Sequence, residues 1–200
     1  MPCIFGELAI FWKKRARTWR RLGVGSKTIG ELCMRVCSGG TPRSGNADYY
    51  EGGTIPWLNT REINFNRIRK TEGFITEAGL AASSAKWIRP NAVIVAMYGA
   101  TAGRCAISKI PLTTNQACCN LEINDEIADY RYVYYWLMSH YGQVARMANG
   151  GAQQNLSAKQ IRELRIKVPE LNYQQKVAEF LASLDDKIDL NQRTNDCLAA

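Results

Sequence analysis

The sequence predicts an α+β protein, in which a globular, β-rich domain of mixed sheet is followed by a long C-terminal coiled-coil helix. Short apolar runs separated by Gly- and Pro-containing turns are typical of buried strands. A stripe of apolar residues with helical period follows in residues 127–144, and a heptad pattern occupies residues 177–198. We therefore expect a basic N-terminal extension over 1–27, a folded domain over 28–168 and a long dimerisation or spacer helix over 169–200.

The composition is that of an ordinary globular chain. It has 200 residues, of which 46% are hydrophobic and 22% charged, enough to build a core without metal or disulfides. No apolar run reaches the roughly 20 residues that cross a bilayer, so we expect no membrane partner. With no evident signal peptide, reduced cysteines in the cytoplasm are the simplest interpretation. The net charge of +8 favours a polyanionic partner.

The basic excess is concentrated in the N-terminal extension. Residues 1–27 hold seven basic groups and one acidic group, and Trp12 and Trp19 lie within or beside the basic run 13–21. This pattern fits a phosphate-binding arm, but a solvated tail or a gene-start artefact explains it equally well. Residues 23–26 are expected to form a hinge before the domain.

The first half of the domain is expected to combine flexible loops with short strands. Residues 38–46 form a dense turn signal, and residues 55–58 a short strand. Thr76 is a plausible N-cap for a short helix that ends near Ala82. The β-branched run 93–98 predicts a buried strand, followed by a tight glycine loop that ends at Arg104.

The second half changes from strands to helices. Residues 105–110 and 117–123 are expected to be strands, the second with alternate residues on one face. The stripe over 127–144 predicts one amphipathic helix whose aromatic residues belong to the core, ended by a turn at 149–151. Ser157 is expected to cap a short helix through Leu164, and a brief strand over 166–168 to stop at Pro169.

The last segment predicts a helix of about 28 residues from Asn172. Its apolar positions alternate spacings of four and three, which defines a seam for another helix. Asn residues at seam positions lower stability but can fix register and partner. The seam consists of Val177, Leu181, Leu184, Ile188, Asn191, Asn195 and Leu198.

The seven cysteines do not form the paired spacings of a structural zinc site. Cys118 and Cys119 are adjacent, and the single histidine, His140, lies within a helical pattern. We therefore expect neither a metal site nor catalytic residues.

Several motifs, in one order along the chain, resemble the specificity subunits of type I restriction–modification systems. They are Gly39-Gly40-Thr41-Pro42, Tyr49-Tyr50 with Ile55-Pro56-Trp57-Leu58, Ser83-Ser84-Ala85-Lys86 with Ile88-Arg89-Pro90, the segment 93–104, Asn115-Gln116-Ala117, Gln153-Gln154-Asn155-Leu156-Ser157, and Val168-Pro169-Glu170-Leu171 leading into Gln174-Gln175-Lys176-Val177-Ala178. The resemblance covers about residues 28–198.

The resemblance implies a non-catalytic reader of double-stranded DNA, with residues 28–168 as its target recognition domain. Subunits of this family carry two such domains separated by long helices. Methyltransferase subunits dock on them, and motor-nuclease (restriction) subunits can join. S-adenosylmethionine and ATP would belong to those partners, so no cofactor is expected here. This chain looks like half of the usual subunit: either a fragment, or one copy of a homodimer that pairs through the C-terminal helix.

Base reading needs forked polar groups aimed at base edges, such as Arg toward guanine and Asn or Gln toward adenine. Glycine-rich loops bring the backbone close to the duplex. Asn115 and Gln116, as part of the general family pattern, are expected to support the fold instead. The candidate DNA-binding residues are Arg43, Ser44, Asn59, Thr60, Arg61, Tyr98, Thr101, Arg104, Gln153, Gln154 and Lys159.

Two other functions remain open from the residues. An RNA-binding module would use the same basic and aromatic residues to stack unpaired bases. A cysteine- or zinc-dependent enzyme would need a base for its nucleophile, and its best candidate is Cys37 beside the first glycine loop.

Overall fold

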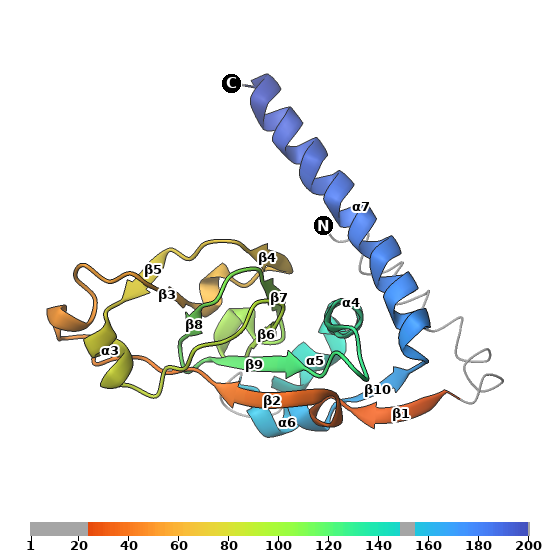
Figure 1. The fold of residues 1–200 in the computed structure, drawn as a ribbon, viewed down its shortest axis with the longest axis horizontal. Coiled ribbons are helices and arrows are strands. Elements are labelled where there is room, and N and C mark those ends of the chain that lie inside the picture. The colour runs from red at the N-terminus through yellow and green to blue at the C-terminus, as the bar shows by residue number, and fades with distance from the viewer. Residues whose placement is uncertain (1–23, 149–154, 200) are drawn as a thin grey trace.

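The computed structural model describes residues 24–148 and 155–199 (Figure 1). A body that contains three sheets carries a long helix at its C-terminal end, and this helix projects away from the body (Figure 1). The basic run 13–21 lies outside the described residues, so its function stays a prediction.

A five-stranded sheet forms the centre of the body. Neighbouring strands are antiparallel, except that the edge strand β4 runs parallel to β7. The central strands are buried on both faces, which explains their uninterrupted apolar sequences. The strands expected over 93–98, 105–110 and 117–123 are confirmed. In spatial order the sheet consists of β2 (Cys33–Ser38), β9 (Cys118–Ile123), β6 (Val93–Ala96), β7 (Cys105–Ser108) and β4 (Asn66–Ile68).

A smaller three-stranded sheet forms a second lobe. It has the order β5 (Gly73–Ile75), β3 (Ile55–Leu58), β8 (Thr113–Thr114). The short helix α3 (Glu77–Ala81) lies in this lobe and begins where the sequence predicts, because the Thr76 hydroxyl accepts a hydrogen bond from the Gly79 amide at 3.1 Å.

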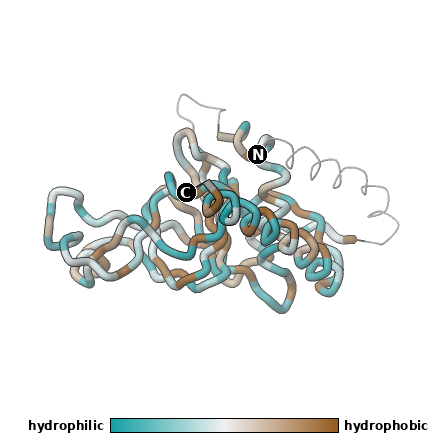
Figure 2. The backbone as a smooth tube through the Cα atoms, turned by 90° about the horizontal axis from the view of Figure 1, so that it is seen from above, coloured by the Kyte–Doolittle hydropathy of each residue, from teal (hydrophilic) through white to brown (hydrophobic). Residues whose placement is uncertain are grey.

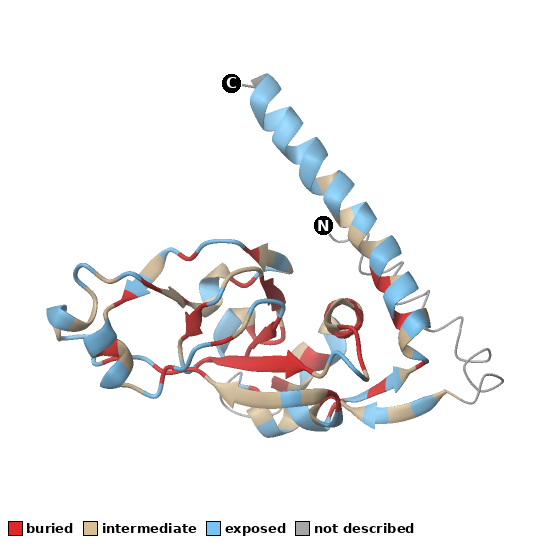
Figure 3. Cartoon of the chain, in the orientation of Figure 1, coloured by how far each residue is buried: buried red, intermediate tan, exposed pale blue. Residues whose placement is uncertain are grey.

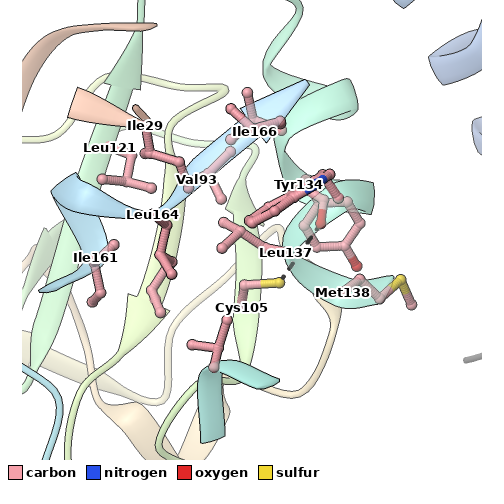
Figure 4. Packing of buried hydrophobic residues seen from close by; sticks show 14 of the residues in the cluster. Ile29, Val93, Cys105, Leu121, Tyr134, Leu137, Met138, Ile161, Leu164 and Ile166 are labelled. Atoms are coloured by element: carbon pink, nitrogen blue, oxygen red, sulfur yellow. Dashed lines mark hydrogen bonds between the residues drawn. The ribbon is translucent and has the colours of Figure 1, made fainter. Parts of the chain in front are cut away.

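The main core lies between one face of the five-stranded sheet and the helices. Val93 and Leu121 from the sheet pack with Tyr134 and Leu137 from α4 (Tyr130–Ser139) (Figure 4). The aromatic stripe therefore belongs to the core, as predicted.

The prediction of a single helix over this stripe is wrong. The chain forms α4 and then α5 (Tyr141–Ala148), with a break at His140. His140 caps α4 in a non-helical conformation, its ring stacks on Trp136 at 4.2 Å between centroids, and its Nδ1 lies 2.9 Å from the Trp136 carbonyl. Because α5 continues the same apolar spacing, a one-residue break leaves no trace in the pattern. The turn expected at 149–151 lies outside the described residues.

The next elements follow the prediction. Helix α6 (Ala158–Glu163) begins at a capping box formed by Ser157 and Gln160. Strand β10 (Arg165–Val168) follows and pairs with β1 (Gly25–Thr28). The prediction of a hinge over residues 23–26 is wrong at Gly25 and Ser26, because both residues lie in strand β1. The pairing of β1 with β10 starts at Gly25, three residues before Thr28, where the domain is expected to begin.

The terminal helix α7 (Leu171–Ala199) has 29 residues and a length of about 43 Å. Hydrophobic and hydrophilic residues alternate along it (Figure 2). Its first half packs on α4, and its second half is exposed (Figure 3). None of the helices in the described part of the chain is long and apolar enough to span a bilayer.

Candidate nucleic-acid interface

Three polar loops leave the same end of the five-stranded sheet. The pairs Ser38–Cys119, Ala96–Cys118 and Val95–Cys105 place the ends of β2 and β6 beside the starts of β9 and β7. Strand β4 also starts there, because it is parallel to β7. The loops 39–46, 59–65 and 97–104, together with residues 115–117, therefore form one surface, which we call the loop end.

The first loop has a fixed base and an exposed tip. The amide of Gly40 donates to the Thr114 carbonyl at 2.9 Å, and the Trp57 indole donates to the Gly40 carbonyl at 3.0 Å. Arg43 and Ser44 are exposed at the tip. Within the described part of the chain, the Arg43 guanidinium makes no hydrogen bond or ion pair, so it is available to a ligand.

The second loop combines a structural residue with an exposed cation. Asn59 caps the 3-10 turn η3 (Thr60–Glu62), and its side-chain oxygen accepts a hydrogen bond from the Asn115 amide at 3.2 Å. Thr60 is half-buried. Arg61 forms an ion pair with Glu72 at 3.1 Å, and both side chains are about two-thirds exposed. Such a pair contributes little stability, so a phosphate or base can replace Glu72.

The third loop turns at two glycines with positive φ, Gly99 (67°) and Gly103 (84°). Tyr98 is exposed, and the Thr101 hydroxyl donates to the Tyr98 carbonyl at 3.3 Å. The Arg104 guanidinium donates to the Asn64 side chain in the second loop at 3.2 Å. Arg104 therefore joins two loops and remains partly accessible.

Asn115 holds the loop end together from beneath. Besides its bond to Asn59, its side-chain oxygen accepts hydrogen bonds from the Ala117 amide at 3.1 Å and the Cys118 thiol at 3.2 Å. Gln116 is exposed and accepts a hydrogen bond from the Thr41 hydroxyl. For Asn115, these contacts agree with the interpretation that it supports the fold.

The remaining candidates do not join this surface in the described structure. Lys159 forms an ion pair with Glu163 at 3.9 Å. It lines a hollow with Gly30 and Glu31, which precede β2 at the opposite end of the sheet. Gln153 and Gln154 lie outside the described residues. Asn155, however, forms a β-bridge with Tyr98, so the chain returns to the loop end directly after them.

The surroundings of the cysteines give no support to the enzyme alternative. Burial raises the pKa of Cys37 above its ordinary value, although Arg35 opposes this shift, so the thiol is a poor nucleophile at neutral pH. His140 is occupied at the junction of α4 and α5. Among the described residues, no group of three His, Cys, Asp or Glu side chains could hold a metal ion.

The predicted seam of α7 divides into two parts. Val177 and Leu181 are half-buried and pack on the main core of the domain. Leu184 is 43% exposed and Leu198 81% exposed, and Asn191 and Asn195 are also exposed. Phe180, which the sequence prediction omits, is 64% exposed, and the spacing Phe180–Leu184–Asn191–Leu198 continues one stripe along the free side of the helix. We call these four residues the free stripe.

The sequence matches a known protein family over nearly the whole described region. The model of the type I restriction modification DNA specificity domain matches residues 23–199. The type I restriction enzyme EcoR124I/EcoR124II specificity subunit of Escherichia coli is 28% identical over 164 residues, which cover 80% of this chain and 40% of the relative. The MjaIX specificity subunit of Methanocaldococcus jannaschii is 32% identical over 179 residues, which cover 86% of this chain and 39% of the relative.

Solved structures show the same fold. The HsdS subunit from Thermoanaerobacter tengcongensis superimposes with a TM-score of 0.64 at 16% identity, over 96% of this chain and 50% of that one. The type I restriction–modification S subunit from M. genitalium superimposes with a TM-score of 0.66 at 18% identity, over 94% of this chain and 47% of that one. The chain thus spans about two fifths of these curated relatives and about half of these solved chains.

Proposed function

Because the chain belongs to the type I restriction modification DNA specificity family, we propose that it is a half-length specificity subunit that binds double-stranded DNA by sequence. The observation that carries this proposal is that the three loops that contain Arg43, Arg61 and Arg104, far apart in the sequence, leave the same end of the five-stranded sheet. Arginine forks are the commonest readers of guanine in the major groove.

The construction of the loop end supports base reading. The bases of the first two loops are held by hydrogen bonds to Thr114 and Asn115, while their arginines remain exposed. A rigid base with a free tip lowers the entropy lost when a side chain is aligned with a base edge. Arg43 is the strongest candidate, because its side chain has no partner to give up within the described structure.

The proposed function is tested by selecting bound duplexes from a random pool, then measuring the selected site with Arg43→Ala. We expect the variant to lose about 5- to 150-fold in affinity for the selected site, equivalent to about 1–3 kcal/mol, and to tolerate substitutions at one base pair. Lys159→Ala, at the opposite end of the sheet, is the matched control and should keep the base preference. Competition with single-stranded RNA that removes the bound duplex at equal concentration would favour the RNA-binding alternative.

The chemistry of the system is assigned to partners. We propose that this chain is non-catalytic and directs methyltransferase subunits, and motor-nuclease subunits where present, to the target in the cytoplasm. S-adenosylmethionine and ATP would then bind to those subunits and not to this chain. The names of the curated relatives, which are specificity subunits of type I restriction enzymes, support this division.

A second copy of this chain is proposed to complete the recognition unit. The chain covers about half of the solved relatives, and α7 presents the free stripe on its exposed side. If two α7 helices pair antiparallel, two recognition domains face the DNA with two-fold symmetry. The target should then be an inverted repeat with an unread spacer.

A further inference from the structure

Helix α7 has two polar attachments to its domain, one on each side of the apolar contacts made by Val177, Ala178 and Leu181. The inner attachment is Gln174, which is 1% exposed. Its side-chain amide donates to the Pro169 carbonyl at 2.8 Å and to the Ile127 carbonyl at 3.2 Å, and its oxygen accepts from the Asp129 amide at 3.1 Å. This buried network fixes the position at which the helix starts.

The outer attachment is centred on Arg67 of the edge strand β4. Its guanidinium binds Asp186, lies 3.9 Å from Asp185 and donates to the Ala182 carbonyl at 3.4 Å. The Tyr135 hydroxyl of α4 donates to Asp185 at 2.7 Å. The Arg67 side chain is only 15% exposed, so α7 covers it and DNA cannot reach most of it.

The charges make this attachment difficult to replace. Burial lowers the pKa of Arg67, but hydrogen bonds to Asp186 and Tyr135 raise it to a net value above the ordinary one, so the group stays charged. Burial also raises the pKa of Asp185, against the opposing effects of Tyr135 and Arg67. Without Arg67, the half-buried Asp185 would keep only its hydrogen bond from Tyr135, and the exposed Asp186 would lose its ion pair and be solvated by water.

The separation of the two attachments determines what each controls. Asp185 lies eleven residues after Gln174, about 17 Å along the helix, and Leu198 about 36 Å after Gln174. If the outer attachment is lost, the helix is still held by Gln174 and by the apolar contacts that end at Leu181, so only the part beyond Leu181, about 26 Å long up to Leu198, can change direction. A bend of about 10° there would move the tip by about 4 Å, slightly more than the rise of one base pair.

We propose that Arg67 is a positioning residue that sets the direction of α7 and thereby the length of DNA spacer accepted between two half-sites. This inference rests on the proposed function, in which two copies pair through α7. Arg67 would act through the helix and not by touching DNA.

The first test measures spacer preference. Half-sites selected by the parent chain are placed as inverted repeats with spacers that differ by single base pairs. We expect the parent to prefer one spacer length at least tenfold over its neighbours, and Arg67→Met to bind two or three lengths within about threefold. Affinity for a single half-site should stay unchanged. Glu179→Gln, which removes the exposed 4.0 Å ion pair between Arg131 and α7 near Leu181, is the control and should keep the parent profile.

The second test needs no DNA. Spin labels are attached to the exposed Cys197 at the end of α7 and to Ala82→Cys in the small lobe, in a chain that carries Cys3→Ser and is mixed with excess unlabelled chain. The distribution of distances between the two labels reports the direction of α7. Arg67→Met should broaden the distance distribution, Arg67→Lys should restore most of its narrow width, and Glu179→Gln should leave it narrow. A parent-like width or spacer profile in Arg67→Met overturns the inference. A parent that binds no two-half-site duplex would instead contradict the proposed function, and the distance distribution alone would then decide whether Arg67 directs the helix.

Discussion

Two adjacent glycines define the base of the first loop because no larger residue fits. A Cβ at Gly39 would lie 2.1 Å from the Thr114 carbonyl oxygen, and one at Gly40 would lie 2.2 Å from the Ala85 amide nitrogen. Both neighbours are backbone atoms that cannot rotate away. The sequence identifies this segment as a turn, but only the packing shows that the glycines bring three segments into contact.

Gly40→Ala should therefore lower the free energy of unfolding by about 3 kcal/mol, the upper part of the usual range for overpacking. Gly45→Ala, in the same loop but with open space around its Cβ, should change it by less than about 0.5 kcal/mol. Urea unfolding followed by fluorescence measures both. Equal stability of the two variants would show that the loop base rearranges freely.

The buried thiols give a second test at this scale. Burial raises the pKa of Cys33 to about 12, although Arg162 opposes this shift, and its thiol donates to the Ile29 carbonyl at 3.1 Å. At pH 8 we expect native Cys33 to react with iodoacetamide on the order of a thousandfold more slowly than the exposed Cys197. Mass spectrometry of the two peptides measures the rates.

The sign of the pH effect follows from the raised pKa. Cys33 stabilises the fold fully below its unfolded pKa near 9, and this contribution is lost as the pH rises toward 12. The reactivity of native Cys33 should therefore increase about tenfold per pH unit in that window. Equal rates for both cysteines at pH 8, without denaturant, would be inconsistent with its burial.

At the scale of elements, strand length decides what the sequence reveals. The strand β6 is predictable because its apolar run is continuous and β-branched. The edge strands are not: β4 has three residues, and β2 mixes apolar, charged and half-buried positions, so neither shows a period. The sequence does not identify Arg67 as an anchor for α7, because Arg67 lies in a short polar strand and its contact with α7 spans more than 110 residues.

Helix α7 is predictable in its extent but not in its attachment. Its inner half is held by Gln174 and Arg67, whereas the residues after Asp189 are exposed on all sides in a single copy. Helical segments without tertiary contacts are marginal in water. In dilute solution, amides of 190–198 should exchange with deuterium much faster than those of 174–185, and they should become protected as the chain is concentrated. Uniform protection at every concentration would contradict a free outer half.

At the scale of the molecule, the candidate surface is a product of topology. The sequence marks glycine-containing loops at 39–46 and 97–104 and polar candidates at 59–61, and the pairing of five strands brings these segments to one end of the sheet. No local pattern separates Arg43, which has no hydrogen bond or ion pair among residues 24–148 and 155–199, from Asn59, which is bound to Asn115. Lys159 matches the loops in chemistry, but the course of α6 places it at the opposite end.

The proposed dimer depends on contact between the free stripes of two copies, and one charged substitution in the stripe tests this contact. Leu184→Glu places a carboxylate in the stripe, so we expect sedimentation to show a monomer at concentrations where the parent is a dimer. Binding to one half-site should persist, while affinity for the inverted repeat should fall by about a hundredfold or more, because the second domain is no longer linked. Leu190→Glu is the matched control, since Leu190 is 63% exposed but lies about 80–120° around the helix from the residues of the stripe. If both variants sediment as the parent does, α7 does not join the copies through this face, and the two-part target would have to arise from some other contact.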